Sequence, residues 1–94
     1  MNSTKKITPY HNMTLSDHVS SLIEQYFAAL DSEAPQKVYN LFLEEVEPTL
    51  LATVMDKVGG NQLKAAKMLG VSRGTLRKKL HYYFKNKYFK IIQD

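Results

Sequence analysis

The sequence of 94 residues contains no cysteine, which excludes disulfides, thiolate metal sites and cysteine nucleophiles. Its three histidines, His11, His18 and His81, show no metal-ligand spacing. No phosphate-binding loop is present, and no nucleophile has a base at a plausible spacing. We therefore expect a protein that is not an enzyme and that uses no metal and no cofactor.

Long apolar runs are also missing. The longest run is only a few residues, too short to span a bilayer as a helix. Lys5 and Lys6 near the N-terminus are not followed by the apolar stretch of a signal peptide. We expect no membrane partner and a cytoplasmic location.

Acidic residues are almost absent from the second part of the chain. Residues 1–56 contain three lysines and eight acids, whereas residues 57–94 contain ten lysines or arginines and a single acid, Asp94. The net charge of +4 therefore understates how basic this region is. Such segregation indicates either a solvated basic face or a binding surface for a polyanion such as nucleic acid.

The periodicity of the apolar residues predicts an all-α protein of four helices. Residues 1–14 are polar, contain Pro9 and show no period, so they are interpreted as a flexible N-terminal arm. Thr14 or Ser16 is suited to cap a first helix of about fourteen residues, and Asp17 to its N-terminal end. Apolar residues then recur at helical spacing along one face: Val19, Leu22, Ile23, Tyr26, Phe27 and Leu30.

A second helix is predicted from about residue 36 to 58, with Gly59 and Gly60 ending it. Pro48 should kink this helix without breaking it. The main apolar stripe of the predicted helix is Val38, Leu41, Phe42, Val46, Leu50, Val54 and Val58, while Leu43, Leu51 and Met55 lie off it. A helix with apolar residues on more than one face needs more than one neighbour, which favours a second chain. Residues 15–60 are thus predicted to be dimerisation helices.

Residues 61–82 have the pattern of a helix-turn-helix unit. Asn61 is a good N-cap for a third helix over 62–69, Gly70 suits a tight turn, and Ser72 suits the cap of a fourth helix. Val71 is expected to anchor the turn in the core. Leu76 and Leu80, four residues apart, should point inward. This layout is typical of a DNA reader, with double-stranded DNA as the partner.

The geometry of such a unit assigns roles to individual side chains. The N-terminal end of the recognition helix enters the major groove, so Arg73 and Ser72 are predicted to contact base edges. Gly74, without a side chain, would let this helix approach a backbone closely. The predicted phosphate contacts are Asn61, Lys64, Thr75, Arg77, Lys78 and Lys79.

These residues closely resemble the Fis family of bacterial DNA-binding proteins. The resemblance is carried by Gly60-Asn61-Gln62, Ala65-Ala66, Leu69-Gly70 and the run 73–80, and it extends upstream through Tyr26-Phe27-Ala28, Val46-Glu47 and Leu50-Leu51. It implies an intertwined homodimer core that places two recognition helices in successive major grooves of bent DNA. It also implies a sequence-tolerant nucleoid protein that regulates transcription, with Arg73 as a base contact and Asn61, Thr75, Arg77 and Lys78 as phosphate contacts.

The sequence departs from the family pattern at a few positions. Ser72 replaces a base-contacting asparagine, Leu63 replaces a phosphate-contacting threonine, Lys64 replaces an arginine, and Pro48 lies one position earlier than the kink proline. About sixteen residues precede the first helix. This is less than the longer members use for their recombinase-contacting β-hairpin, so recombinase contact is not expected.

Two other interpretations stay open from the sequence. The motif also occurs in the DNA-binding domains of NtrC-type enhancer-binding regulators, although Met1 and the match in the first two helices favour the Fis family. The chain could instead be a helical protein–protein interaction module. The tail 83–94 interleaves aromatics with lysines. It could touch flanking DNA, or extend the fourth helix and pack Phe84, Tyr88 and Ile91 or Ile92 on the core, which we favour.

Overall fold

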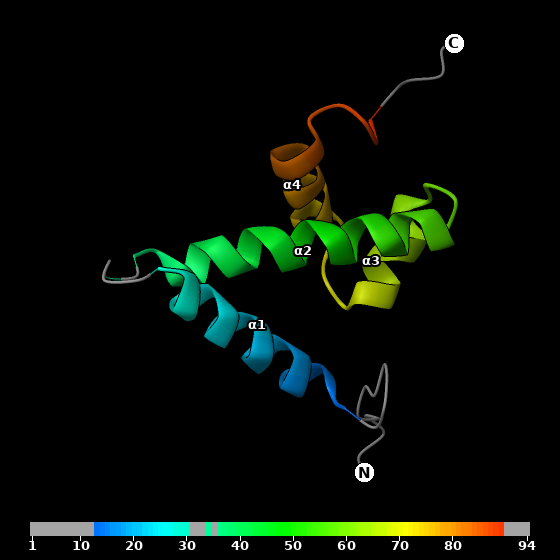
Figure 1. Cartoon of the computed structure of the whole chain (residues 1–94). Coiled ribbons are helices and arrows are strands. Elements are labelled where there is room, and N and C mark those ends of the chain that lie inside the picture. The colour runs from blue at the N-terminus through cyan, green and yellow to red at the C-terminus, as the bar shows by residue number, and fades with distance from the viewer. Residues whose placement is uncertain (1–12, 31–33, 35, 90–94) are drawn as a thin grey trace. The chain divides into compact units, whose positions relative to one another are not determined.

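A computed structural model describes residues 13–30, 34 and 36–89 of the chain. Within these residues the backbone forms four α-helices, in the order α1, α2, α3 and α4 (Figure 1). The all-α prediction is confirmed. The predicted N-terminal arm lies almost wholly outside the described residues, as do Ile91 and Ile92 of the tail. The chain divides into two compact units, residues 1–37 and 38–94.

The first unit contains α1, Leu15–Ala29. Thr14 is its N-cap, and the cap is reciprocal: the Asp17 amide donates to Thr14 Oγ1 at 3.1 Å, and the Thr14 amide donates to Asp17 Oδ2 at 3.0 Å. The predicted cap at Thr14 and the role of Asp17 are confirmed. No residue of α1 is buried, and Leu22 of its apolar stripe is 55% exposed. Phe27 is exposed as well, the other stripe residues are half-buried, and the stripe therefore has no fully buried residue.

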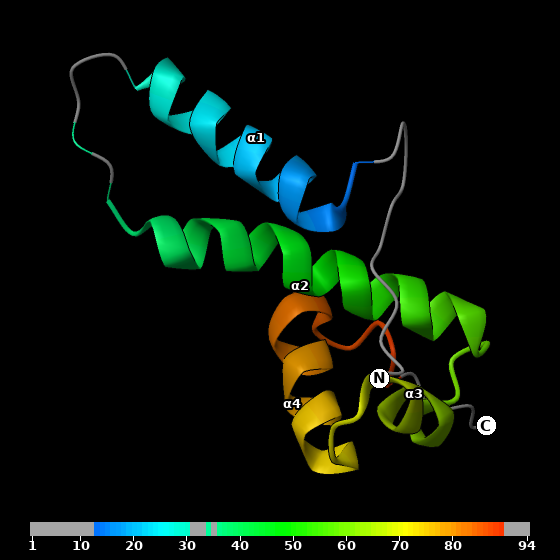
Figure 2. The same ribbon diagram turned by 90° about the horizontal axis from the view of Figure 1, so that it is seen from below.

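The second unit contains α2, Val38–Lys57; α3, Gln62–Leu69; and α4, Arg73–Phe84. Each of these helices contacts the other two, and Figure 2 shows α3 and α4 side by side against α2. Six buried residues form the shared core: Leu51, Met55, Ala65, Ala66, Leu76 and Leu80. The small Ala65 and Ala66 lie where α3 must approach its neighbours closely, and Leu76 and Leu80 point inward as predicted.

The second unit covers only the C-terminal part of the main apolar stripe predicted for α2, where Val54 and Val58 pack partly buried against the core. Leu51 and Met55, which lie off that stripe, are 4% and 1% exposed, while Val46 and Leu50 are 55% and 51% exposed. Periodicity shows that a face is apolar and does not show what covers it, so the sequence did not predict which face α3 and α4 would cover. α2 thus has one face against α3 and α4 and another that these two helices leave exposed.

The helix ends follow from local chemistry. Gly59, Gly60 and Gly70 all have positive φ, and Gly70, at +76°, is the left-handed C-cap of α3. α2 continues through Pro48, as predicted, and Thr49 Oγ1 donates to the carbonyl of Glu45 at 2.8 Å, next to the hydrogen bond that proline removes. Val71 is 37% exposed, so the expectation that it anchors the turn in the core is wrong. Its amide holds the turn instead, by donating to the carbonyl of Ala66 at 3.1 Å.

Candidate nucleic-acid interface

The N-terminal end of α4 points away from α2 (Figure 2). Ser72 caps this end: its Oγ accepts the Thr75 amide at 3.0 Å and donates to Thr75 Oγ1 at 3.0 Å. The hydroxyl of Ser72, a predicted base contact, is therefore already used within the chain. Both residues are exposed and lie at the positive end of the helix, where unpaired amides favour an anion.

Arg73 follows directly as the first residue of α4. It is exposed, and within the described residues its side chain makes no hydrogen bond or ion pair. Gly74 comes next, and a Cβ built there would meet only Ser72 Oγ, at 4.0 Å, so the chain itself does not require glycine at this position. The free end of α4 thus combines an unengaged arginine with a backbone that has no side chain above it.

A second helix start lies at α3. Asn61 is its N-cap, with Oδ1 accepting the Lys64 amide at 3.0 Å, as predicted. The side chain of Lys64 is exposed. α3 and α4 pack together, so their two N-terminal ends belong to one unit that carries no acidic residue between 57 and 93.

Arg77 joins these two helices. Its Nη1 donates to Oε1 of Gln62, in the first turn of α3, at 2.9 Å. Its guanidinium also lies over the ring of Phe89, 4.7 Å from the ring centroid. Arg77 remains exposed, as does Lys78 beside it. The predicted phosphate residues Arg77 and Lys78 therefore stay open to solvent, one held by neutral partners and the other on the helix face opposite Leu76 and Leu80.

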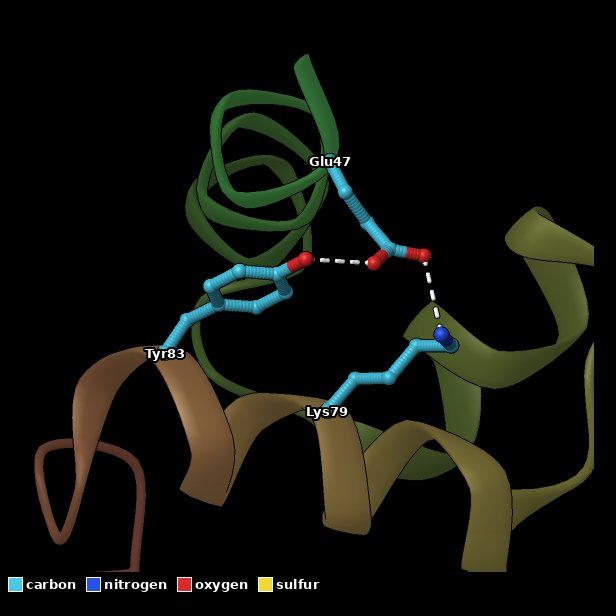
Figure 3. A network of polar contacts seen from close by, with 3 residues as sticks. All are labelled: Glu47, Lys79 and Tyr83. Carbon is cyan, nitrogen blue, oxygen red and sulfur yellow. Dashed lines mark hydrogen bonds and ion pairs between the residues drawn. The ribbon is translucent and has the colours of Figure 1, made fainter. Parts of the chain in front are cut away.

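Lys79 is placed differently from the other predicted phosphate residues. Its Nζ lies 3.0 Å from Oε2 of Glu47 on α2, with the two side chains 40% and 21% exposed. Tyr83, one turn further along α4, donates to Oε1 of the same carboxylate at 2.6 Å (Figure 3). Lys79 thus points towards α2, and its charge is compensated within the chain.

The hydrogen bonds of this cluster shift the pKa values of Glu47 and Tyr83. The pKa of the Glu47 carboxyl lies below its ordinary value because Tyr83, and then Lys79, donate hydrogen bonds to the carboxylate. The same bond raises the pKa of Tyr83 to about 12, because it stabilises the neutral phenol beside an anion. Tyr82 donates to Glu44 Oε2 at 2.8 Å, and this contact raises its pKa as well. These polar contacts lock α4 onto α2.

The partners in these contacts were not predicted from the sequence. Gln62 and Phe89 hold Arg77, and Tyr83 shares Glu47 with Lys79. Each bond joins side chains far apart in the sequence, so no local signal was available beyond the aromatic content of the tail. Among the described residues, no cluster of three metal-binding side chains occurs, and no helix is long and apolar enough to cross a bilayer.

Comparison with known proteins gives a consistent result. The model of the family described as "Bacterial regulatory protein, Fis family" matches residues 42–83. A Fis-like DNA-binding protein of Pseudomonas aeruginosa is 53% identical over 70 residues, which cover 74% of this chain and 67% of that protein. The DNA-binding protein Fis of Actinobacillus succinogenes is 47% identical over 83 residues, covering 88% and 81%. The DNA-binding protein Fis of Mannheimia haemolytica is 46% identical over 72 residues, covering 77% and 74%.

Proposed function

The chain belongs to the Fis family of bacterial regulatory proteins, and from this premise we propose that it binds double-stranded DNA as a homodimer. The observation that carries the proposal is the free N-terminal end of α4, with Arg73 exposed and no acid in residues 57–93. The curated relatives named as DNA-binding support it. The family resemblance read from the sequence is confirmed.

In the proposed complex, the start of α4 enters the major groove. Arg73 contacts base edges, where its guanidinium suits the paired acceptors of guanine. Ser72 lies beside it, but its hydroxyl already bonds Thr75, so its base contact is the weaker of the two. The proposed phosphate contacts are Asn61, Lys64, Thr75, Arg77 and Lys78; Lys79 keeps its bond to Glu47 and adds charge nearby.

The homodimer is proposed to cover the apolar faces that a single chain leaves open. α1 buries no residue, and α2 exposes Val46 and Leu50 on the face away from its core. A second copy placed on these faces would remove them from water, which is the main favourable term in association. Two copies of α4 would then read successive grooves of bent DNA, so that DNA shape supplies much of the specificity. We assign the protein to the cytoplasm, at the nucleoid, as a regulator of transcription.

The salt dependence of DNA binding tests this function. If several phosphates are neutralised, the logarithm of the affinity should fall with the logarithm of salt concentration, with a slope of about −0.9 per phosphate. We expect Lys78→Ala to make the slope shallower by about one unit per subunit, since its ammonium is free. Lys79→Ala is the matched control and should leave the slope nearly unchanged. A flat slope for the wild-type protein would exclude DNA as the main partner.

Base reading by Arg73 needs a separate test. We expect Arg73→Ala to weaken binding by about 1–3 kcal/mol and to relax the preference for guanine at one position of each half-site. Binding to a panel of sites that differ at single positions measures this. Equal weakening on every site would make Arg73 a phosphate contact.

A further inference from the structure

The backbone reverses direction directly after α4. Lys85, the C-cap, has φ of +55°, a left-handed value that is uncommon for lysine, and its amide donates to the carbonyl of His81 at 2.9 Å. The amides of Lys87 and Phe89 then donate to the carbonyls of Phe84 and Asn86, at 3.1 and 3.0 Å. The residues 85–89, called here the return segment, are therefore an ordered continuation of the fold.

The return segment is fixed to the helix-turn-helix unit by its aromatic side chains. Tyr88 and Phe89 are partly buried against the core, and the Tyr88 ring meets Phe84 edge to face, with centroids 5.2 Å apart. The ring of Phe89 meets His81 at 6.0 Å in a similar arrangement. The predicted packing of Phe84 and Tyr88 on the core is thus confirmed. This packing places the Phe89 ring beside Arg77, on the exposed side of α4.

A polar contact ties the same segment to α3. The Gln62 side chain donates through Nε2 to the carbonyl of Tyr88 at 2.9 Å, and its Oε1 accepts from Arg77 at 2.9 Å. One amide thus joins the return segment, the start of α3 and the middle of α4. The guanidinium of Arg77 lies between this amide and the Phe89 ring.

We propose that the return segment is a positioning element: Phe89 and Gln62 hold the Arg77 guanidinium ready to bind a DNA phosphate. Phe89 contacts the face of the guanidinium and Gln62 takes one of its five N–H donors, so the remaining donors stay available in the guanidinium plane. Both partners are neutral, so neither of them compensates the charge of Arg77, whereas Glu47 compensates that of Lys79. The Arg77 side chain therefore loses its conformational freedom when the protein folds and not when it binds DNA.

This inference rests on the proposed function, and a double-mutant cycle separates the two. We expect Phe89→Leu, which keeps an apolar side chain but removes the aromatic face, to weaken DNA binding about 3- to 10-fold at fixed salt. In an Arg77→Ala background the same change should have no further effect. Phe89→Tyr, which restores the ring, should recover the wild-type affinity. Gln62→Ala removes the other partner of Arg77 and leaves the aromatic side chains unchanged, and it should weaken DNA binding in the same way.

The free protein offers a readout that does not involve DNA. The sequence contains only two arginines, Arg73 and Arg77, so each Nε–Hε signal can be followed separately by NMR. We expect the Arg77 signal to be shifted by the ring current of Phe89 and to lose this shift in Phe89→Leu, while the Arg73 signal stays unchanged.

The outcomes are distinct. Equal weakening by Phe89→Leu with and without Arg77, unchanged or tighter binding in Phe89→Leu, or an Arg77 signal insensitive to it, would each overturn the positioning role while DNA binding stands. Weak, salt-independent binding by the wild-type protein would overturn the proposed function, and the positioning role with it.

Discussion

The helix α1 and the unit formed by α2, α3 and α4 differ in how far their apolar side chains are buried. Among its described residues, the second unit has six that are buried, drawn from all three of its helices. α1 has an apolar stripe, and none of its residues is fully buried. An apolar stripe without a fully buried residue favours a surface for a partner, whereas a shared core indicates a unit with its own stability. The comparison separates assembly, proposed for α1 and the open face of α2, from DNA reading, proposed for α3 and α4.

The largest expected effect comes from breaking the core of the second unit. Leu76 is fully buried, and Leu76→Ala should lower the free energy of unfolding by about 2–5 kcal/mol, because it removes apolar contacts and leaves a cavity. Urea denaturation followed by circular dichroism measures this. A loss below about 1 kcal/mol would show that this core contributes little and that the contrast between the two units is not real.

A substitution in α1 should affect association instead of the core. Leu22→Asp removes an exposed apolar side chain whose burial in a dimer would be worth about 1.5–3 kcal/mol per chain, and it adds a charge there. We expect sedimentation to shift from dimer to monomer. Ser21→Asp adds the same charge on the opposite side of α1 and is the control. If both variants stay dimeric, the stripe of α1 is not the dimer interface.

A substitution at Gly74 tests the second unit in another way, because it should change the stability of the fold and the affinity for DNA in opposite directions. The chain has room for a Cβ there, so Gly74→Ala should stabilise the fold by about 0.5–1 kcal/mol. If α4 approaches DNA closely, the same methyl group should weaken DNA binding. Thermal unfolding and a binding titration on the same protein measure both effects. Unchanged binding would mean that α4 does not approach DNA at this residue.

The smallest effect concerns the polar lock between α2 and α4. The folded pKa of Glu47 lies below its ordinary 4.5, so its contribution is present above pH 4.5 and is lost as the pH falls through the lower folded pKa. Tyr83 has a raised pKa, so its part is present below pH 10 and is lost as the pH rises through about 12. Glu47→Gln should lower stability at pH 7 by at most about 1 kcal/mol.

Urea unfolding of both proteins at pH 7 and pH 3 checks this expectation. The difference between wild type and Glu47→Gln should shrink at pH 3. A difference that is the same at both values would mean that Glu47 acts through its shape and not through its charge.

The helices and their ends were predictable from the sequence because their causes are local. Thr14, Asn61 and Ser72 cap helices, and Gly70 ends α3, through bonds to residues within four positions. The face of α2 that is buried was not predictable, since periodicity marks an apolar face without identifying its neighbour. The contacts of Arg77 and Lys79 were not predictable either, because they join residues 12 to 32 positions apart in the sequence. The reversal at Lys85 was not predictable either, because no glycine marks it in the sequence.

The cap of α4 has a consequence for how this family can diversify. The start of the helix depends on an oxygen that accepts the Thr75 amide, and serine and asparagine provide that oxygen about equally well. An exchange between them at residue 72 should therefore change stability little, while it changes the group that faces DNA in the proposed complex. The side chain at this residue can therefore change during evolution without a second mutation that restores stability. The serine present here, where the resemblance implies an asparagine, is a variation of that kind.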